Sequence, residues 1–312
     1  MKLGFLFPGQ GSQAVGMLGE VAAAHPIIEA TFHEASEVLD LPLWALACDG
    51  PEEKLNQTEI TQPILLTASV ALWRAWIAAG GAEPGIMAGH SLGEYSALVC
   101  AGAMSFSEGV ALVRQRGALM QQAVPQGEGA MAAILGLEDD QIDACCAQID
   151  GVVSPANFNA PGQVVIAGSA LAVEEAVALC TEAGARRAVM LKVSGPFHCE
   201  LMMPAVEGFA AALDQVDLQM PTIPVVHNVD ARVATSVDEL REKLLAQMAQ
   251  PVRWSSCVEE MVRHGAESFV ECGSGKVLAG LIKRIDRGRS VFNLETESGF
   301  NDGLASSAGE AS

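Results

Sequence analysis

The segment that most constrains the fold spans residues 86–94, where a short apolar run leads into Gly89-His90-Ser91-Leu92-Gly93. This spacing fits the G-x-S-x-G pattern, in which a strand turns sharply into a helix with a serine at the turn. Both flanking positions must lack a Cβ because the turn is so tight. We therefore predict a strand over 86–88, a helix over 94–100 and a strained Ser91 with an exposed Oγ. Taken alone, the motif could instead be a glycine-rich turn from a strand to a helix around a buried serine.

The composition predicts a soluble protein of the cytoplasm. The chain has 312 residues, half of them hydrophobic, which suffices for one large domain plus an insertion. The apolar run before Pro8 is too short for a signal peptide, and no run approaches bilayer length. The eight cysteines lack C-x-x-C spacing and are interpreted as reduced thiols, and the six histidines lack metal-ligand spacing. We expect no metal site, and a frayed tail over 305–312.

The net charge of −20 argues against nucleic acid as a partner. An anionic partner would need a local basic patch. The densest cluster lies at 283–289, with Lys283, Arg284, Arg287 and Arg289, and a second one contains Arg186, Arg187 and Lys192. For either cluster, an equal explanation is a solvated helix end whose cations face the negative end of the helix dipole.

The N-terminal third predicts a strand, a loop and two helical segments. The strand covers 2–7 and runs into Gly9-Gln10-Gly11, where backbone N–H groups can approach a ligand. This loop is not a phosphate loop, because it lacks the lysine and the glycine spacing. Helical segments follow at 20–39 and 60–79, and Pro63 suits the first turn of the second.

A capping box at Ser105 and Glu108 opens a further helix, which extends to about residue 124. Arg116 lies at the edge of its apolar stripe, where an arginine is usually a surface residue that extends its head group into water.

Between 127 and 193 the order of elements becomes β-α-β-β-α-β, with a tight connection at Ala160-Pro161-Gly162. This order predicts a ferredoxin-like unit inserted into a larger domain, which then comprises 1–126 and 194–312.

His198 follows the insertion, in a loop that leads into a helix over 201–213. A lone histidine at a helix start is more often structural, but the serine motif elsewhere favours a catalytic role. Strands and helices then alternate, which predicts a mostly parallel sheet with helices on both faces. The strands are expected at 223–228, 268–272 and 290–294, and the helices at 237–248, 255–264 and 276–285.

Six segments carry a resemblance to a known family. They are Phe7-Pro-Gly-Gln-Gly-Ser-Gln13, Gly89-His-Ser-Leu-Gly-Glu94, Gln115-Arg-Gly117, Asn157-Phe-Asn-Ala-Pro-Gly162, Phe197-His198 and Gln250-Pro-Val-Arg-Trp254. In this order they resemble the malonyl-CoA:acyl carrier protein transacylases of bacterial fatty acid synthesis, over residues 2–295. The resemblance implies an α/β-hydrolase-like large domain, a ferredoxin-like subdomain and a site in the cleft between them.

The same resemblance implies the catalytic roles. Ser91 would carry the malonyl group as an ester, and His198 would be the base of a ping-pong reaction. A backbone carbonyl from the region of Gln250 would orient the histidine, and the N–H groups of Gln10 and Leu92 would form the oxyanion hole. Malonyl-CoA and the acyl carrier protein would be the partners of a monomer, with no cofactor besides the coenzyme A thioester.

Arg116 would bind the malonyl carboxylate, because a planar guanidinium can pair with it through two parallel hydrogen bonds. Phe197 stands where many relatives have a small residue and is expected to narrow the pocket against an α-methyl group. The pocket is also expected to involve Gln62, His90, Asn157 and Asn159. For the two asparagines, packing of the local hairpin is an equal explanation.

Three other functions stay open. First, the same acyl transfer could serve malonate decarboxylase or a polyketide pathway. Second, a thioesterase would share Ser91 and His198 but would release the acyl group to water. Third, a scaffold protein would bind the carrier without catalysis. Arg116 argues against hydrolysis, and the joint presence of Ser91, His198, Arg116 and the Gln10 loop argues against a scaffold.

Overall fold

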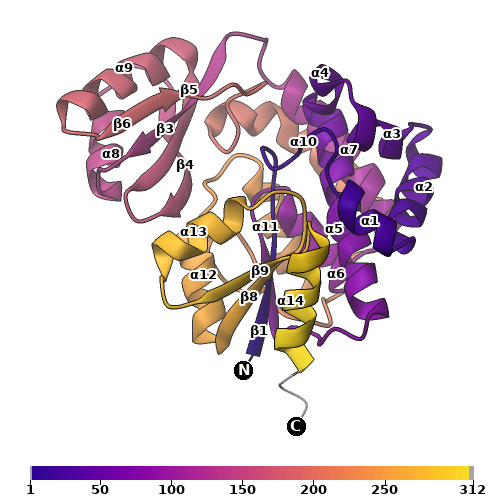
Figure 1. Cartoon of the computed structure of the whole chain (residues 1–312). Helices are drawn as coiled ribbons and strands as arrows, with labels where there is room; N and C mark the ends of the chain where they lie inside the picture. The colour runs from indigo at the N-terminus through magenta and orange to yellow at the C-terminus, as the bar shows by residue number, and fades with distance from the viewer. Residues whose placement is uncertain (1, 309–312) are drawn as a thin grey trace.

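The computed structural model describes residues 2–308 and shows two units, each built on its own sheet (Figure 1). The larger unit has a five-stranded parallel sheet and the smaller one a four-stranded antiparallel sheet. None of the helices in this range combines the length and the apolar composition that a bilayer crossing requires.

The central strand of the large sheet is β1, which is buried on both faces. Phe5 and Phe7 of β1 point into the larger core of the molecule, and Leu6 points into a second core on the opposite face. Such two-sided burial is typical of parallel sheets. In spatial order the strands are β7 (Val225–Val226), β2 (Ile86–Gly89), β1 (Lys2–Phe7), β8 (Ala266–Glu271) and β9 (Ser290–Asn293).

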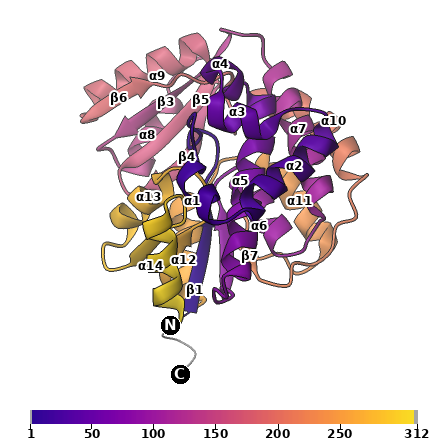
Figure 2. The same cartoon turned by 45° about the vertical axis from the view of Figure 1, so that its right-hand side comes forward.

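Helices cover both faces of this sheet, as predicted (Figure 2). The larger core contains side chains from α2 (Ile27–Leu39), α5 (Thr58–Ala78), α6 (Gly93–Cys100), α7 (Phe106–Gln122), α10 (Met203–Leu213), α11 (Val237–Gln247) and α14 (Glu297–Ala308). The second core is formed with α12 (Trp254–Arg263) and α13 (Val277–Ile285). Short helices complete the unit: α1 (Gly19–Ala24), α3 (Leu43–Asp49), α4 (Glu52–Leu55) and the 3₁₀ turn η1 (Glu200–Met202).

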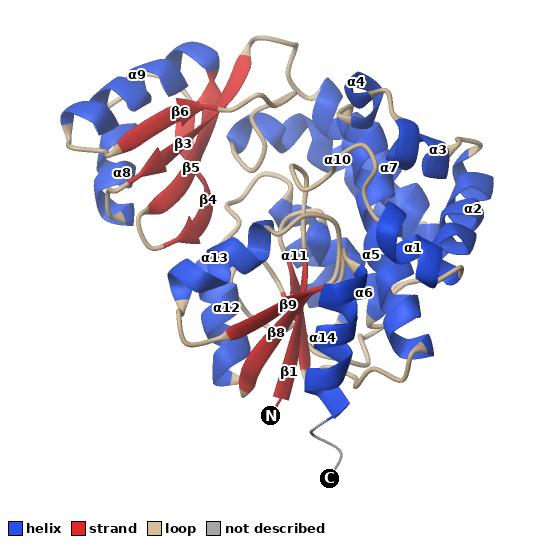
Figure 3. Ribbon diagram, viewed as in Figure 1, coloured by secondary structure: helices blue, strands red, loops and turns tan. Residues whose placement is uncertain are grey.

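The small unit has the predicted β-α-β-β-α-β order (Figure 3). Its strands lie in the order β4 (Val153–Ala160), β5 (Gln163–Ser169), β3 (Gly129–Leu135) and β6 (Arg187–Met190), and α8 (Asp139–Cys146) and α9 (Ala170–Glu182) pack on a separate core. The predicted α/β class with a ferredoxin-like insertion is confirmed. The exact limits 127–193 stay a prediction, since the regular elements occupy 129–190.

Pro63 lies inside α5, and its predicted place in the first turn is wrong, because the helix begins at Thr58. A proline has no N–H for the carbonyl four residues earlier, which here belongs to Glu59. Arg114 on α7 donates to that carbonyl at 2.7 Å and so replaces the missing helical hydrogen bond.

Two further predictions are corrected at the ends of elements. The segment 20–39 forms two helices, α1 and α2, which are separated at Pro26. The predicted fraying from 305 is wrong for 305–308, which belong to α14, and 309–312 lie outside the described residues. Helix α14 is held by Phe300, which is fully buried and meets the Trp76 ring edge-on at 6.1 Å.

The close approach of α6 to β1 generates a stability prediction. A Cβ on Gly93 would lie 2.0 Å from the Phe7 carbonyl oxygen, which is backbone and cannot move aside. We expect Gly93→Ala to lower the free energy of unfolding in urea by about 3 kcal/mol or more. Gly280→Ala is the control, because it adds a Cβ to helix α13 in open space and should raise stability by roughly 0.5–1 kcal/mol. Equal effects of the two substitutions would contradict the contact argument.

Candidate active site

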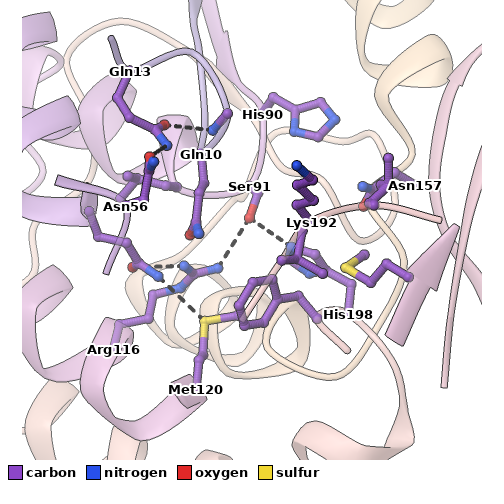
Figure 4. Close-up of a pocket in the computed structure, with 17 residues that line it drawn as sticks. Gln10, Gln13, Asn56, His90, Ser91, Arg116, Met120, Asn157, Lys192 and His198 are labelled. Atoms are coloured by element: carbon purple, nitrogen blue, oxygen red, sulfur yellow. Dashed lines mark hydrogen bonds between the residues drawn. The ribbon is translucent and has the colours of Figure 1, made fainter. Parts of the chain in front are cut away.

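Ser91 occupies the sharp turn between β2 and α6, with a φ of +52°. A Cβ on Gly89 would lie 1.8 Å from the backbone carbon of Gly93, so the two glycines are required by direct contact across the turn. This geometry confirms the predicted elbow. Ser91 lines a cavity of about 420 Å³, and Arg116 and His198 line the same cavity (Figure 4).

His198 lies within hydrogen-bond distance of Ser91 and comes from the loop that leaves the small unit. Its Nε2 accepts from the Ser91 hydroxyl at 2.6 Å, and its Nδ1 lies 2.8 Å from the Gln247 carbonyl oxygen. A carbonyl can only accept, so Nδ1 carries the ring proton and Nε2 is free to receive the serine proton. The pair is therefore arranged as nucleophile and base.

The orienting carbonyl is that of Gln247, so the prediction of Gln250 is wrong. Helix α11 ends at Gln247, and the residue four positions later is Pro251, which has no N–H to donate. The Gln247 carbonyl is thereby free for His198. The Gln250 side chain lines a different cavity, and its carbonyl contributes only weakly to the pKa of His198.

Burial is the main cause that lowers the pKa of His198, to about 3, and the neighbouring positive charge of Arg116 lowers it further. The Gln247 carbonyl opposes this shift but does not cancel it. The imidazole is therefore neutral at physiological pH, which is the form that can accept a proton.

Arg116 is buried, with 1% of its surface exposed, although the sequence pattern favoured an exposed head group. Its Nη1 donates to Gln62 Oε1 at 2.9 Å, and its Nη2 donates to Gln247 Oε1 at 2.9 Å and lies 3.4 Å from Ser91 Oγ. The Nε has no partner. Among the described residues no carboxylate pairs with Arg116, in contrast to Arg74 and Arg114, which form ion pairs. The site thus contains a desolvated cation that lacks an anion.

The backbone N–H groups of Gln10 and Leu92 fit the predicted oxyanion hole. Both residues line the cavity with Ser91, and neither N–H donates to another residue in the described range. Leu92 lies immediately before α6, where the helix dipole favours negative charge. The Gln10 side chain donates to Thr58 Oγ1 at 3.1 Å, which fixes the loop after β1.

The remaining predicted residues divide between two cavities. Gln62, His90, Asn157 and Phe197 line the main cavity, and Gln62 also holds Arg116. Asn159 lies outside it, in an adjoining cavity of about 210 Å³, and its Oδ1 bonds to His90 Nε2 at 2.8 Å. The hydrogen bond between His90 and Asn159 ties the wall between the two cavities, and Phe197 lines the main one.

Sequence reasoning missed three residues behind the cavity: Glu94, Asn228 and the side chain of Gln247. Asn228 Oδ1 accepts from the Ser91 N–H at 2.7 Å, and its Nδ2 donates to the Gly89 carbonyl at 2.8 Å. A signal for Asn228 exists, because it follows β7 at the carboxyl edge of the sheet, where ligand sites of open parallel sheets lie. The loops after the adjacent β2 and β1 supply Ser91 and Gln10 at the same edge.

The chain is similar to known proteins over nearly its whole length. Residues 4–288 match the acyl transferase domain family. The chain is 56% identical to the malonyl CoA-acyl carrier protein transacylase of Escherichia coli K12 over 286 residues, which are 91% of this chain and 93% of the relative.

Solved structures give the same result. The crystal structure of an acyl carrier protein S-malonyltransferase from Vibrio cholerae superposes with a TM-score of 0.95 at 52% identity, and covers 97% of this chain and 99% of its own. A malonyl-transacylase solved in complex with a type II polyketide acyl-carrier protein gives 0.97 at 49% identity, and covers 98% and 100%. Because the family model matches residues 4–288 and these relatives are about half identical over nearly the whole chain, the chain belongs to the malonyl-CoA:acyl carrier protein transacylases of the acyl transferase family.

Proposed function

We propose that this protein transfers malonyl from malonyl-CoA to the phosphopantetheine thiol of acyl carrier protein, for fatty acid synthesis in the cytoplasm. The observation that carries the proposal is the buried Arg116, which lacks an anion and lies 3.4 Å from Ser91 Oγ. A malonyl group attached at Ser91 would supply the missing carboxylate.

In the first half-reaction Ser91 Oγ attacks the thioester carbonyl, and its proton moves to His198 Nε2. The N–H groups of Gln10 and Leu92 stabilise the negative oxygen of the tetrahedral intermediate. The C–S bond then breaks, and the coenzyme A sulfur leaves with the proton from His198. The product is a malonyl ester of Ser91.

In the second half-reaction His198 takes the proton of the carrier's thiol, whose sulfur attacks the ester carbonyl. The C–O bond to Ser91 breaks, and Oγ recovers the proton from His198. Each step exchanges one acyl bond for another with no oxidation or reduction. The proposed reaction therefore needs no cofactor, and coenzyme A takes part only as the donor's carrier.

We expect the carrier to dock on exposed cations. Lys192 lines the cavity mouth, and Arg186, Arg187, Lys283 and Arg284 are exposed. Arg289 Nε donates to Asp286 Oδ2 at 2.8 Å, so this arginine is less available to the carrier. We expect the protein to act as a monomer.

Acylation of Ser91 in the absence of acceptor tests the proposed function. After brief mixing with malonyl-CoA, intact mass should show a malonyl adduct on the wild type and none on Ser91→Ala. In Arg116→Ala malonyl loading should fall by about 30-fold or more, because loss of one partner of a buried charge pair costs about 2–5 kcal/mol. Acetyl loading should persist in that variant. Equal loading of acetyl and malonyl by the wild type would contradict the role of Arg116.

The lowered pKa of His198 predicts a broad acidic range of activity. Because the folded-state pKa is about 3, the base stays neutral as pH falls and becomes protonated only near that value. Inactivation of Ser91 by a neutral sulfonyl fluoride should therefore have a constant rate from about pH 8 to pH 5, the range above this pKa. In Arg116→Ala the decline of the inactivation rate at acidic pH should move to higher pH, because one cause that lowers the pKa of His198 is removed. A decline centred near the ordinary histidine pKa in the wild type would contradict the structure.

Charge reversal tests the docking surface. We expect Lys192→Glu, and the pair Lys283→Glu with Arg284→Glu, to slow transfer to the carrier at low salt, with a difference that shrinks as salt rises. Arg263→Glu on α12, outside both clusters, is the control. Transfer rates that do not change at low salt would exclude the cluster concerned.

A further inference from the structure

Gln247 contacts all three groups that carry the proposed reaction, although it does not line the cavity. Its carbonyl accepts from His198, and its side chain is fully buried. The amide Oε1 accepts from Arg116 Nη2 at 2.9 Å, and the amide Nε2 donates to the Ser91 carbonyl at 3.0 Å. A guanidinium can only donate and a carbonyl can only accept, so these partners fix the orientation of the amide.

The same amide connects Arg116 to a buried carboxylate. Gln247 Nε2 also donates to Glu94 Oε2 at 2.9 Å, and Glu94 is fully buried in the first turn of α6. The other contacts of Glu94 are the Asn228 N–H at 2.9 Å and His227 Nδ1 at 2.7 Å. No lysine or arginine in the described range pairs with Glu94, just as no carboxylate pairs with Arg116.

Two opposite charges are thus buried one neutral amide apart. A carboxylate in direct contact with Arg116 would occupy the donors that a substrate carboxylate needs. A buried cation with no anion nearby would carry a large desolvation penalty. The amide between them lets Glu94 compensate the charge of Arg116 at a distance and leaves the guanidinium available on the cavity side.

We infer that the Gln247 side chain is a positioning residue for selectivity: it holds the Arg116 guanidinium toward Ser91 and separates it from Glu94. This rests on the proposed function, since it explains how the site prefers an acyl group with a free carboxylate. The Gln247 carbonyl is unaffected by changes of the side chain, so substitutions separate this role from the orientation of His198.

The test measures single-turnover acylation of Ser91 by malonyl-CoA and by acetyl-CoA, with kcat and KM for each, in Gln247→Glu and Gln247→Met. Glutamate has the same length and brings a carboxylate against Arg116, whereas methionine removes every hydrogen bond of the side chain. We expect each variant to lower the ratio of malonyl to acetyl kcat/KM by about tenfold or more, in Gln247→Glu mainly through a higher KM for malonyl-CoA. Damage to the elbow itself affects both acyl groups and cancels in the ratio.

Arg116→Ala supplies the double-mutant cycle. In that background neither Gln247 variant should change the ratio further, and acetyl loading shows that each variant is folded. If Arg116→Ala lowers the ratio but both Gln247 variants keep the wild-type ratio, the inference is wrong and the proposed function stands. A further fall in the Arg116→Ala background would also overturn it, because the effect would not pass through Arg116. If Arg116→Ala leaves the ratio unchanged, the carboxylate clamp and the inference both fail.

Discussion

The contact between the start of α6 and the end of β1 determines where the chemistry can occur. Gly93 packs directly on the Phe7 carbonyl, and Gly89 packs on Gly93, so the chain must turn between them with Ser91 at a positive φ. The strain in that turn is balanced by Asn228, which bonds to the Ser91 N–H and to the Gly89 carbonyl. One tight contact therefore fixes the nucleophile and leaves the next N–H, that of Leu92, without a hydrogen-bond partner among residues 2–308.

Burial gives the other groups of the site their properties. His198 is kept neutral chiefly because water is excluded from its ring, and its proton is held on Nδ1 by a backbone carbonyl in place of a carboxylate. A carboxylate at that position would raise the basicity of the ring. It would also add a negative charge to a site that, in the proposed reaction, receives the carboxylate of the malonyl group. The carbonyl orients the ring without that charge, and the charged residues that line the cavity, Arg116 and Lys192, are both cations.

Local features of the site could be predicted from the sequence, whereas contacts across the fold could not. The elbow glycines, the capping box at Ser105 and the β-α-β-β-α-β order depend on neighbouring residues, and the structure confirms them. The orienting carbonyl was misplaced by one helical turn because its position depends on where α11 ends relative to His198, 49 residues earlier. Pro63 was misplaced for a similar reason, since a residue of another helix, Arg114, donates to the Glu59 carbonyl that a proline inside the helix leaves unbonded.

The buried charges also couple substrate binding to the strength of the base. Arg116 is the second cause of the low pKa of His198, after burial. In the proposed reaction a carboxylate bound to Arg116 would offset that positive charge, so the pKa of His198 would rise with malonyl in the site and would stay low with a neutral acyl group. A base with a higher pKa, still neutral at physiological pH, removes a proton from a serine or thiol more readily. In the proposed function Arg116 would therefore act on malonyl twice, first by pairing with its carboxylate and then by ceasing to depress the basicity of His198.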